Sequence, residues 1–377
     1  MLPLKSKIAL VLWLSILIRL FYPIEVYGTV EYNELVTFAK QLESSIESGS
    51  PYYFNLCFDT DAIIEKVINQ DKFRANKAFS SGFIEGIKQE FDLGAIIIEE
   101  TRSGGSFRFV RAYQDNNRSK VLFRLISDFG INYHEYEVQS HNGKLMIVEG
   151  YIFITAQTIS KLFEDVYNVY LYSMSRFPED NNEYKSEYLI RQLISEGKHL
   201  KAFKKLYKLP DNERYLRSYQ LMGISLAQEL NKKQFFSTYI EFLQHFPEEP
   251  GKYMVPLNGL IQHGYYQAAL VSIDKLDEMI QHDPLLYFLR ATIYYEMGDL
   301  KHTEVSLNQL IESVPDFEKG YLSLLGMYLD HKQFGKATDL LDRMILTFNT
   351  FKENLSPFLT HYQDFINSAE YRNWMEN

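Results

Sequence analysis

The sequence predicts two structural parts: an N-terminal α+β domain of helices plus a four-stranded antiparallel meander, and a C-terminal all-α helical solenoid. Two observations predict this division. Between residues 107 and 154, apolar and polar residues alternate with the period of two that is typical of strands. Further along the chain, Tyr219, Tyr253, Tyr287 and Tyr321 follow one another at intervals of 34 residues. A fixed interval of this length indicates stacked helical hairpins.

Residues 1–28 have the features of an export signal. Lys5 and Lys7 give a positively charged start, and an apolar stretch follows over Ile8–Ile18. This stretch is too short to span a bilayer comfortably. The sequence therefore predicts an exported protein, periplasmic or secreted, with no integral membrane domain once the signal is cleaved. In the alternative, the apolar stretch extends to Ile24 and stays uncleaved as a membrane anchor.

The segment 29–172 begins with three predicted helices. Apolar residues at three- and four-residue spacing predict a helix over 35–46, a second from about Asp61, and a third from Lys72 to Glu100, bent near Gly94. A cysteine, Cys57, lies between the first two among phenylalanine and leucine neighbours. As the one cysteine of the chain it cannot form an internal disulfide, and we expect a buried side chain in preference to a nucleophile.

Four strands in two hairpins follow the helices. They are predicted over 107–113, 120–126, 131–138 and 145–154. The Asn-Gly pair at 142–143 favours a tight hairpin turn. Helices that pack on one face of such a meander form an α+β domain. A last helix over 158–170 then leads to a linker at 173–182, which separates this domain from the repeats.

This order of elements resembles the nuclear-transport-factor-2-like or cystatin-like cone. The resemblance implies a curved sheet that can wrap a pocket, which some members use for small ligands or catalysis. Strand alternation puts Asn132, His134 and Tyr136 on one face of the third strand. His134, Tyr136 and Glu149 are therefore the polar cluster that we expect at a pocket, if one exists. The alternative for these residues is a solvated face.

The 34-residue units repeat more than a tyrosine. The clearest unit runs from Pro284 to Phe317, and its fixed positions are Tyr287, Ala291, Tyr294, Gly298, Asp299, Leu307 and Pro315. This pattern resembles the tetratricopeptide repeat, in which bulky and small residues alternate so that two helices nest closely. Thr303 stands where that family has alanine, and its hydroxyl can bond back to its own helix. About five such hairpins are predicted over 183–351, followed by a capping helix at 352–377.

The resemblance implies a concave groove lined by first-helix residues that flank the core positions. These are Arg217, Gln220, Ala227, Gln228, Met254, Asn258, Gln262, Phe288, Tyr295, Glu296, Leu322 and Asp330. Chaperone-binding members of the family clamp a peptide carboxylate with several Lys, Arg and Asn residues. The set here holds one arginine, one asparagine and two acids, which argues against a carboxylate clamp. For any single residue, a solvated face is the alternative.

Composition narrows the function further. The net charge is −10 and no Lys/Arg-rich run is present, so the sequence lacks the basic footprint that nucleic-acid binding requires. No phosphate-binding loop, serine elbow or metal-ligand spacing occurs, and we predict no catalytic residues, metal or cofactor. The sequence thus favours a non-enzymatic exported scaffold that binds a protein or peptide. The alternative is a small-ligand-binding or enzymatic N-terminal domain whose repeats recruit its substrate.

Overall fold

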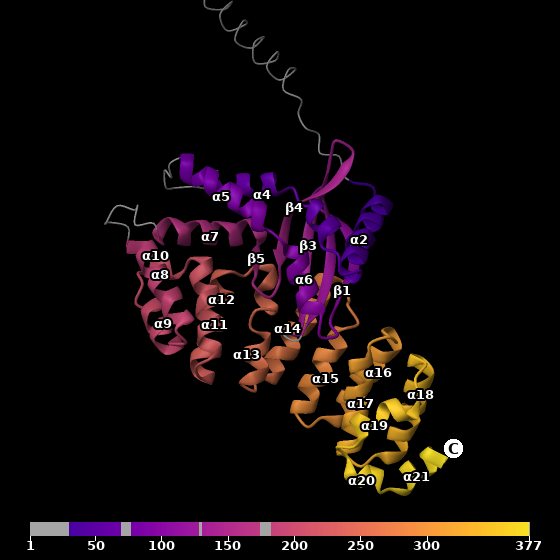
Figure 1. Cartoon of the computed structure of the whole chain (residues 1–377). Coiled ribbons are helices and arrows are strands. Elements are labelled where there is room, and N and C mark those ends of the chain that lie inside the picture. The colour runs from indigo at the N-terminus through magenta and orange to yellow at the C-terminus, as the bar shows by residue number, and fades with distance from the viewer. Residues whose placement is uncertain (1–29, 69–76, 128–129, 174–181, 377) are drawn as a thin grey trace, which may run out of the picture. The chain divides into compact units, whose positions relative to one another are not determined.

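The computed structural model describes residues 30–68, 77–127, 130–173 and 182–376, in two units, Met1–Lys185 and Ser186–Asn377 (Figure 1). An antiparallel sheet with helices forms the first unit, and the second is mostly helical. This confirms the predicted order of an α+β part followed by a helical part. The predicted export signal at 1–28 and most of the predicted linker, at 174–181, lie outside the described residues.

The first unit contains one sheet with five antiparallel strands in the order β1-β2-β3-β4-β5. The strands are β1 (Ser106–Asp115), β2 (Arg118–Ser127), β3 (Gly130–His141), β4 (Lys144–Ile152) and β5 (Gln157–Thr158). The four predicted strands are confirmed, while the two-residue β5 was not predicted. At the predicted Asn-Gly turn, Asn142 and Gly143 have φ values of 51° and 76°. Positive φ at both positions is the type I′ geometry that fits the twist of a hairpin.

One edge of this sheet is irregular. β1 is an edge strand, and its register against β2 shifts between Phe109 and Arg111, which marks a β-bulge. At the opposite edge, the short β5 pairs only with Tyr151 and Ile152 of β4, and Ile147 of β4 exchanges backbone hydrogen bonds with Cys57 and Asp59. Both edges therefore differ from the regular pairing in the middle of the sheet.

Six described helices accompany the sheet. They are α2 (Tyr32–Glu47), α3 (Tyr52–Leu56), α4 (Thr60–Ile68), α5 (Lys77–Glu90), α6 (Leu93–Thr101) and α7 (Ile159–Ser173). The prediction of a single helix from Lys72 to Glu100 is wrong, because α5 ends before Asp92 and a new helix begins there. The Asp92 side chain accepts a hydrogen bond from the amide of Ala95 at 2.8 Å and so caps α6.

The core of this unit lies between the helices and one face of the sheet. Buried residues from α2, α3, α4 and α6 join sheet residues such as Val121, Phe123 and Tyr136 in one hydrophobic cluster. The Phe107 and Phe123 rings stack at 4.6 Å, and Phe54 meets Tyr136 edge-on at 5.9 Å. Aromatic side chains therefore fill this face of the sheet, which is the face that would have lined a cone pocket.

The second unit is a succession of helices. Its first members are α8 (Asn182–Ser195), α9 (His199–Leu206), α10 (Asp211–Arg214), α11 (Arg217–Gln228) and α12 (Lys232–His245), followed by the 3₁₀ turn η1 (Pro250–Tyr253). Next come α13 (Leu257–Gln262), α14 (Tyr266–Ile280), α15 (Leu286–Glu296), α16 (Leu300–Ser313), α17 (Glu318–Asp330) and α18 (Phe334–Phe348). From α11 to α18, neighbours joined by a short turn pack together as hairpins.

Two parts of this unit depart from the regular pattern. The first helix of the hairpin around Tyr253 is interrupted, because Pro256 lacks an amide hydrogen and only the short α13 forms after it. The predicted capping helix at 352–377 is instead three short helices. These are α19 (Lys352–Leu359), α20 (Gln363–Ile366) and α21 (Ala369–Glu376). Of the four tyrosines spaced by 34 residues, Tyr219 and Tyr321 are core residues, each 1% exposed, whereas Tyr253 and Tyr287 are only half-buried.

Candidate functional site

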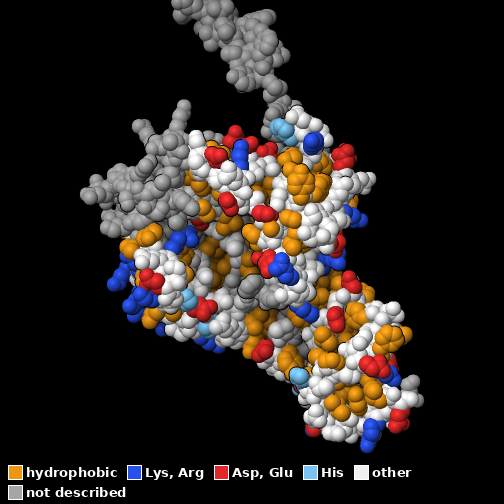
Figure 2. All heavy atoms as spheres, viewed as in Figure 1, with side chains coloured by type: hydrophobic (Ala, Val, Ile, Leu, Met, Phe, Trp, Pro, Cys, Tyr) orange, Lys and Arg blue, Asp and Glu red, His pale blue; other side chains and the backbone are white. Residues whose placement is uncertain are grey.

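A groove lies between α15 and α17 in the helical unit, above residues of α16, and has a volume of about 240 Å³. Its lining consists of Phe288, Ala291, Thr292, Tyr295, Thr303, Leu307, Ser323, Gly326, Met327 and Asp330. Three of these, Phe288, Tyr295 and Asp330, were predicted from the sequence to line a groove. Hydrophobic side chains gather on the surface of the C-terminal helices in the same unit (Figure 2).

Eight of the lining residues come from α15 and α17, and they have the same spacing along both helices. On α15 the lining residues are Phe288, Ala291, Thr292 and Tyr295, and on α17 they are Ser323, Gly326, Met327 and Asp330. Each set follows i, i+3, i+4 and i+7, which places its members on one helix face. The second set lies 35 residues after the first, as the separation of Tyr295 and Asp330 shows. The groove is therefore a product of two consecutive hairpins.

The floor of the groove is made of small and apolar side chains. Ala291, Thr303 and Leu307 are each 2% exposed. The Thr303 hydroxyl donates to the carbonyl oxygen of Asp299 at 2.8 Å, as predicted for a threonine at this position. Because that hydroxyl is satisfied within its own helix, the floor presents mainly carbon atoms to an incoming group.

The rim carries the one charged side chain in the lining, Asp330. The Tyr295 hydroxyl donates to its Oδ2 at 3.0 Å and thereby joins the ends of α15 and α17. Burial, and then the hydrogen bond to the Asp330 carboxylate, raise the pKa of Tyr295. The hydroxyl therefore stays protonated and acts as a donor, which holds the carboxylate at the groove.

The other predicted groove residues are not brought together there. Gln220 and Met254 are 1% and 5% exposed, and Ala227 is also buried, so the expectation of an open lining does not hold for them. Arg217 forms an ion pair with Glu249. The residues that remain are half-buried or exposed on other parts of the unit: Gln228, Asn258, Gln262, Glu296 and Leu322.

Sequence reasoning missed seven lining residues, of which Ala291, Thr303 and Leu307 were expected only as core positions of the repeat. Thr292, Ser323, Gly326 and Met327 occupy positions between or beside the predicted ones. The available signal was helical spacing, because residues three and four positions from Phe288 or Asp330 share its face. Positions taken from a repeat pattern alone do not specify how far each helix is rotated about its axis.

The polar cluster predicted in the sheet is part of the core. The imidazole Nδ1 of His134 lies 2.9 Å from the Tyr136 hydroxyl, and both side chains are buried. Burial lowers the pKa of His134 to about 4, so the ring is neutral at physiological pH. Glu149 has other partners: it accepts from the amide of Ser160 at 3.2 Å and pairs with Lys66 at 3.3 Å. The three residues do not form one site.

Cys57 is likewise a core residue, as expected. It is 6% exposed, and burial raises the pKa of its thiol to about 11. We expect a maleimide reagent at pH 7 to modify Cys57 at least tenfold more slowly in the native protein than in urea, because the thiolate is the reactive form. Mass spectrometry of timed samples measures both rates. Equal rates would mean that the thiol is accessible in the native state.

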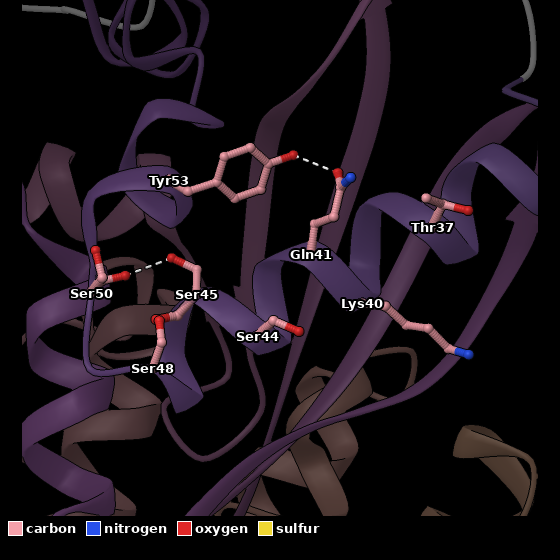
Figure 3. A pocket seen from close by; sticks show the side chains of 8 residues that line it. All are labelled: Thr37, Lys40, Gln41, Ser44, Ser45, Ser48, Ser50 and Tyr53. Carbon is pink, nitrogen blue, oxygen red and sulfur yellow. Dashed lines mark hydrogen bonds between the residues drawn. The ribbon is translucent and has the colours of Figure 1, made fainter.

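A second pocket, of about 610 Å³, lies between α2 and the turn into α3 (Figure 3). It is lined by Thr37, Lys40, Gln41, Ser44, Ser45, Ser48, Ser50 and Tyr53. Local hydrogen bonds explain most of this polarity. The Ser45 hydroxyl donates to the Ser50 carbonyl oxygen at 2.5 Å, and the Ser48 hydroxyl donates to the Ser45 carbonyl oxygen at 2.9 Å. These hydrogen bonds satisfy polar groups at the C-terminal end of α2. The polar lining therefore has a structural role, and we assign this pocket no ligand.

In the described part of the chain, no three His, Cys, Asp or Glu side chains are grouped so as to hold a metal ion. Across the same residues, no helix combines the length and the apolar character needed to cross a membrane. Comparisons of the chain with protein-family models, curated proteins and solved structures gave no match. The groove between α15 and α17 is therefore judged on its own geometry and chemistry.

Proposed function

We propose that this protein is an exported scaffold that binds a segment of a protein or peptide partner in the groove between α15 and α17. The observation that carries the proposal is the origin of the lining: eight of its ten residues come from the first helices of two consecutive hairpins. The resemblance to tetratricopeptide repeats assigns partner contacts to those helices. A stack of such hairpins forms a solenoid that buries one side of each unit and leaves a long surface for binding.

The side chains of the groove fit this role. Tyr295 is 39% exposed although it lies beside an apolar floor, and the half-buried Phe288 adds apolar surface. Tyrosine and other aromatic residues in partly enclosed sites often dominate the energy of protein interfaces. The volume of about 240 Å³ is below the range typical of cofactor and drug-sized ligand sites and suits one or two amino-acid side chains.

The alternative of a small-ligand or enzymatic N-terminal domain has less support. It called for polar groups that converge in an apolar pocket near His134 and Glu149. Instead, His134 packs against the Phe107 ring at 6.0 Å, within the aromatic filling of the sheet. The sheet face is occupied by the protein's own side chains, and we therefore favour the scaffold.

A leucine at Gly326 tests the proposal by filling the groove. The nearest side-chain atom to a Cβ added there is the Tyr362 hydroxyl oxygen, at 3.4 Å, so the helix can accept the larger residue. We expect Gly326→Leu to lower partner recovery at least tenfold while leaving the melting temperature equal or higher, since glycine weakens a helix interior. Crosslinked affinity capture with the full chain, followed by quantitative mass spectrometry, gives the recoveries.

Gly335→Leu is the matched control. Gly335 is also a helical glycine of this unit, in α18, and a Cβ there meets no atom within 4 Å. It lies outside the groove lining. The control variant should recover the same partners as the parent protein. If both variants recover partners equally well, the groove is not the binding site.

A further inference from the structure

The chemistry of the groove points to the class of segment that it takes. Building on the proposed function, we propose that the partner segment places an apolar side chain on the groove floor and an adjacent lysine or arginine against Asp330. The apolar part follows from Ala291 and Leu307, which form a floor with only 2% exposure. The basic part follows from the charge and surroundings of the rim.

The rim offers a negative charge whose position is fixed. Asp330 is exposed, and the Tyr295 hydroxyl donates to one of its oxygens, Oδ2, at 3.0 Å. A hydroxyl donor holds the carboxylate in one orientation, as a receptor for a cation requires. None of the ten lining residues is a lysine or an arginine that would neutralise it. The nearby Lys332 is already paired with Asp364 at 2.6 Å.

Two tyrosines lie near this carboxylate. Tyr295 donates to it, and burial, followed by the charge of Asp330, raises the pKa of Tyr362. Tyr362 also borders the groove, since its hydroxyl lies 3.4 Å from a Cβ built at Gly326. A carboxylate beside two tyrosines favours an ammonium or guanidinium group, because cation–π attraction to a tyrosine ring can add to the ion pair.

The same features exclude the opposite ligand. A terminal carboxylate or an acidic side chain at the rim would meet Asp330 at close range without a compensating cation in the lining. Like charges brought together at an interface weaken binding and thereby select against wrong partners. The groove should therefore discriminate by charge as well as by the presence of an apolar residue.

The test uses two pools of fluorescent octapeptides, acetylated and amidated at their ends, with the full-length protein. Each peptide of the first pool holds neighbouring leucine and lysine in a Gly/Ser background, and the second pool has glutamate in place of lysine. We expect the parent protein to bind the lysine pool about three- to tenfold more tightly in fluorescence anisotropy, as suits an exposed ion pair with a cation–π contribution. Asp330→Asn should remove that preference, and Asp330→Lys should reverse it.

The outcomes separate this inference from the proposed function. If the parent protein binds both pools equally and Gly326→Leu abolishes both, the groove binds peptides but Asp330 does not select for a basic residue. If binding to both pools is unaffected by Gly326→Leu, the groove itself is not the site and both proposals fail. No binding of the parent protein to either pool also overturns the inference. Because Asp330 is exposed, Asp330→Asn and Asp330→Lys are both expected to keep the parent melting temperature.

Discussion

Acidification from pH 7 to pH 5 is expected to destabilise the N-terminal unit by about 2 kcal/mol through one residue, His134. Burial lowers the pKa of this histidine to about 4 from its usual value of 6.5. Between these two values the unfolded chain binds a proton that the folded chain does not bind. The contribution of His134 to the free energy of unfolding is therefore fully present above about pH 6.5. It decreases as the pH falls towards 4, by about 3 kcal/mol in total.

The hydrogen bonds around His134 explain why the neutral ring is retained. The Asn132 Oδ1 accepts from the amides of Tyr133 at 2.8 Å and Ile154 at 3.0 Å, which fixes its Nδ2 towards His134. That Nδ2 lies 3.2 Å from the imidazole Nε2, which must therefore accept. Nδ1 then carries the proton and donates to Tyr136. A second proton on Nε2 would oppose the Asn132 donor.

Urea unfolding at pH 7 and pH 5 measures this loss of stability. The reaction of Cys57 with a thiol reagent reports how much of the N-terminal unit is unfolded. The variant His134→Gln keeps a polar side chain but cannot gain a proton, so the loss between the two pH values should shrink by about 2 kcal/mol. The control His141→Gln changes an exposed histidine of the same strand and should behave as the parent. An unchanged loss in His134→Gln would contradict the assignment to this ring.

Replacing Gly259 by alanine is expected to destabilise the helical unit by about 1–3 kcal/mol. A Cβ at this position would lie 2.3 Å and 2.4 Å from two ring carbons of Phe235. Phe235 is fully buried, so its ring cannot move aside without opening the packing of α12. This steric cost exceeds the gain of roughly 0.5–1 kcal/mol that alanine brings to a helix. Thermal and urea unfolding quantify the difference.

A second substitution separates overpacking from other causes. Shortening the ring in the double variant Gly259→Ala/Phe235→Leu should restore part of the stability lost in Gly259→Ala, because the two residues share one contact and their effects are not additive. Gly335→Ala, at a helical glycine with open space around its Cβ, should be neutral or slightly stabilising. Strictly additive effects in the double variant would show that the predicted clash does not exist.

The sequence predicts most of the secondary structure because local spacing governs it. The alternation of residues 107–154 and the turn residue Gly143 are sufficient to place β1–β4. In the hairpins, Tyr219 and Tyr321 are buried as predicted, but Tyr253 and Tyr287 are only half-buried. The same reasoning failed at Asp92, where a single side-chain hydrogen bond starts a new helix. It also missed the close approach between Gly259 and Phe235, because this contact joins two different helices and the spacing within one helix does not predict it.

The candidate site was only partly predictable. Phe288, Tyr295 and Asp330 were correctly expected in a groove, yet Gln220 and Met254 are buried. Successive residues of a helix differ in direction by about 100°, so one position decides whether a side chain points outward or into the packing. The alternation of β3 correctly placed Asn132 and His134 on one face. It could not indicate that helices cover this face, because covering depends on contacts between distant segments.

The irregular edges of the sheet have a consequence for how the protein behaves at high concentration. An exposed, regular edge strand is a template on which another chain can add its own strand. Here the β1 edge is interrupted by the bulge between Phe109 and Arg111. On the other side, β5 pairs with Tyr151 and Ile152 of β4, and Ile147 of β4 exchanges backbone hydrogen bonds with Cys57 and Asp59. Neither edge provides a long uninterrupted row of backbone groups for such pairing. The sheet is thereby protected against edge-to-edge aggregation with other copies of the chain.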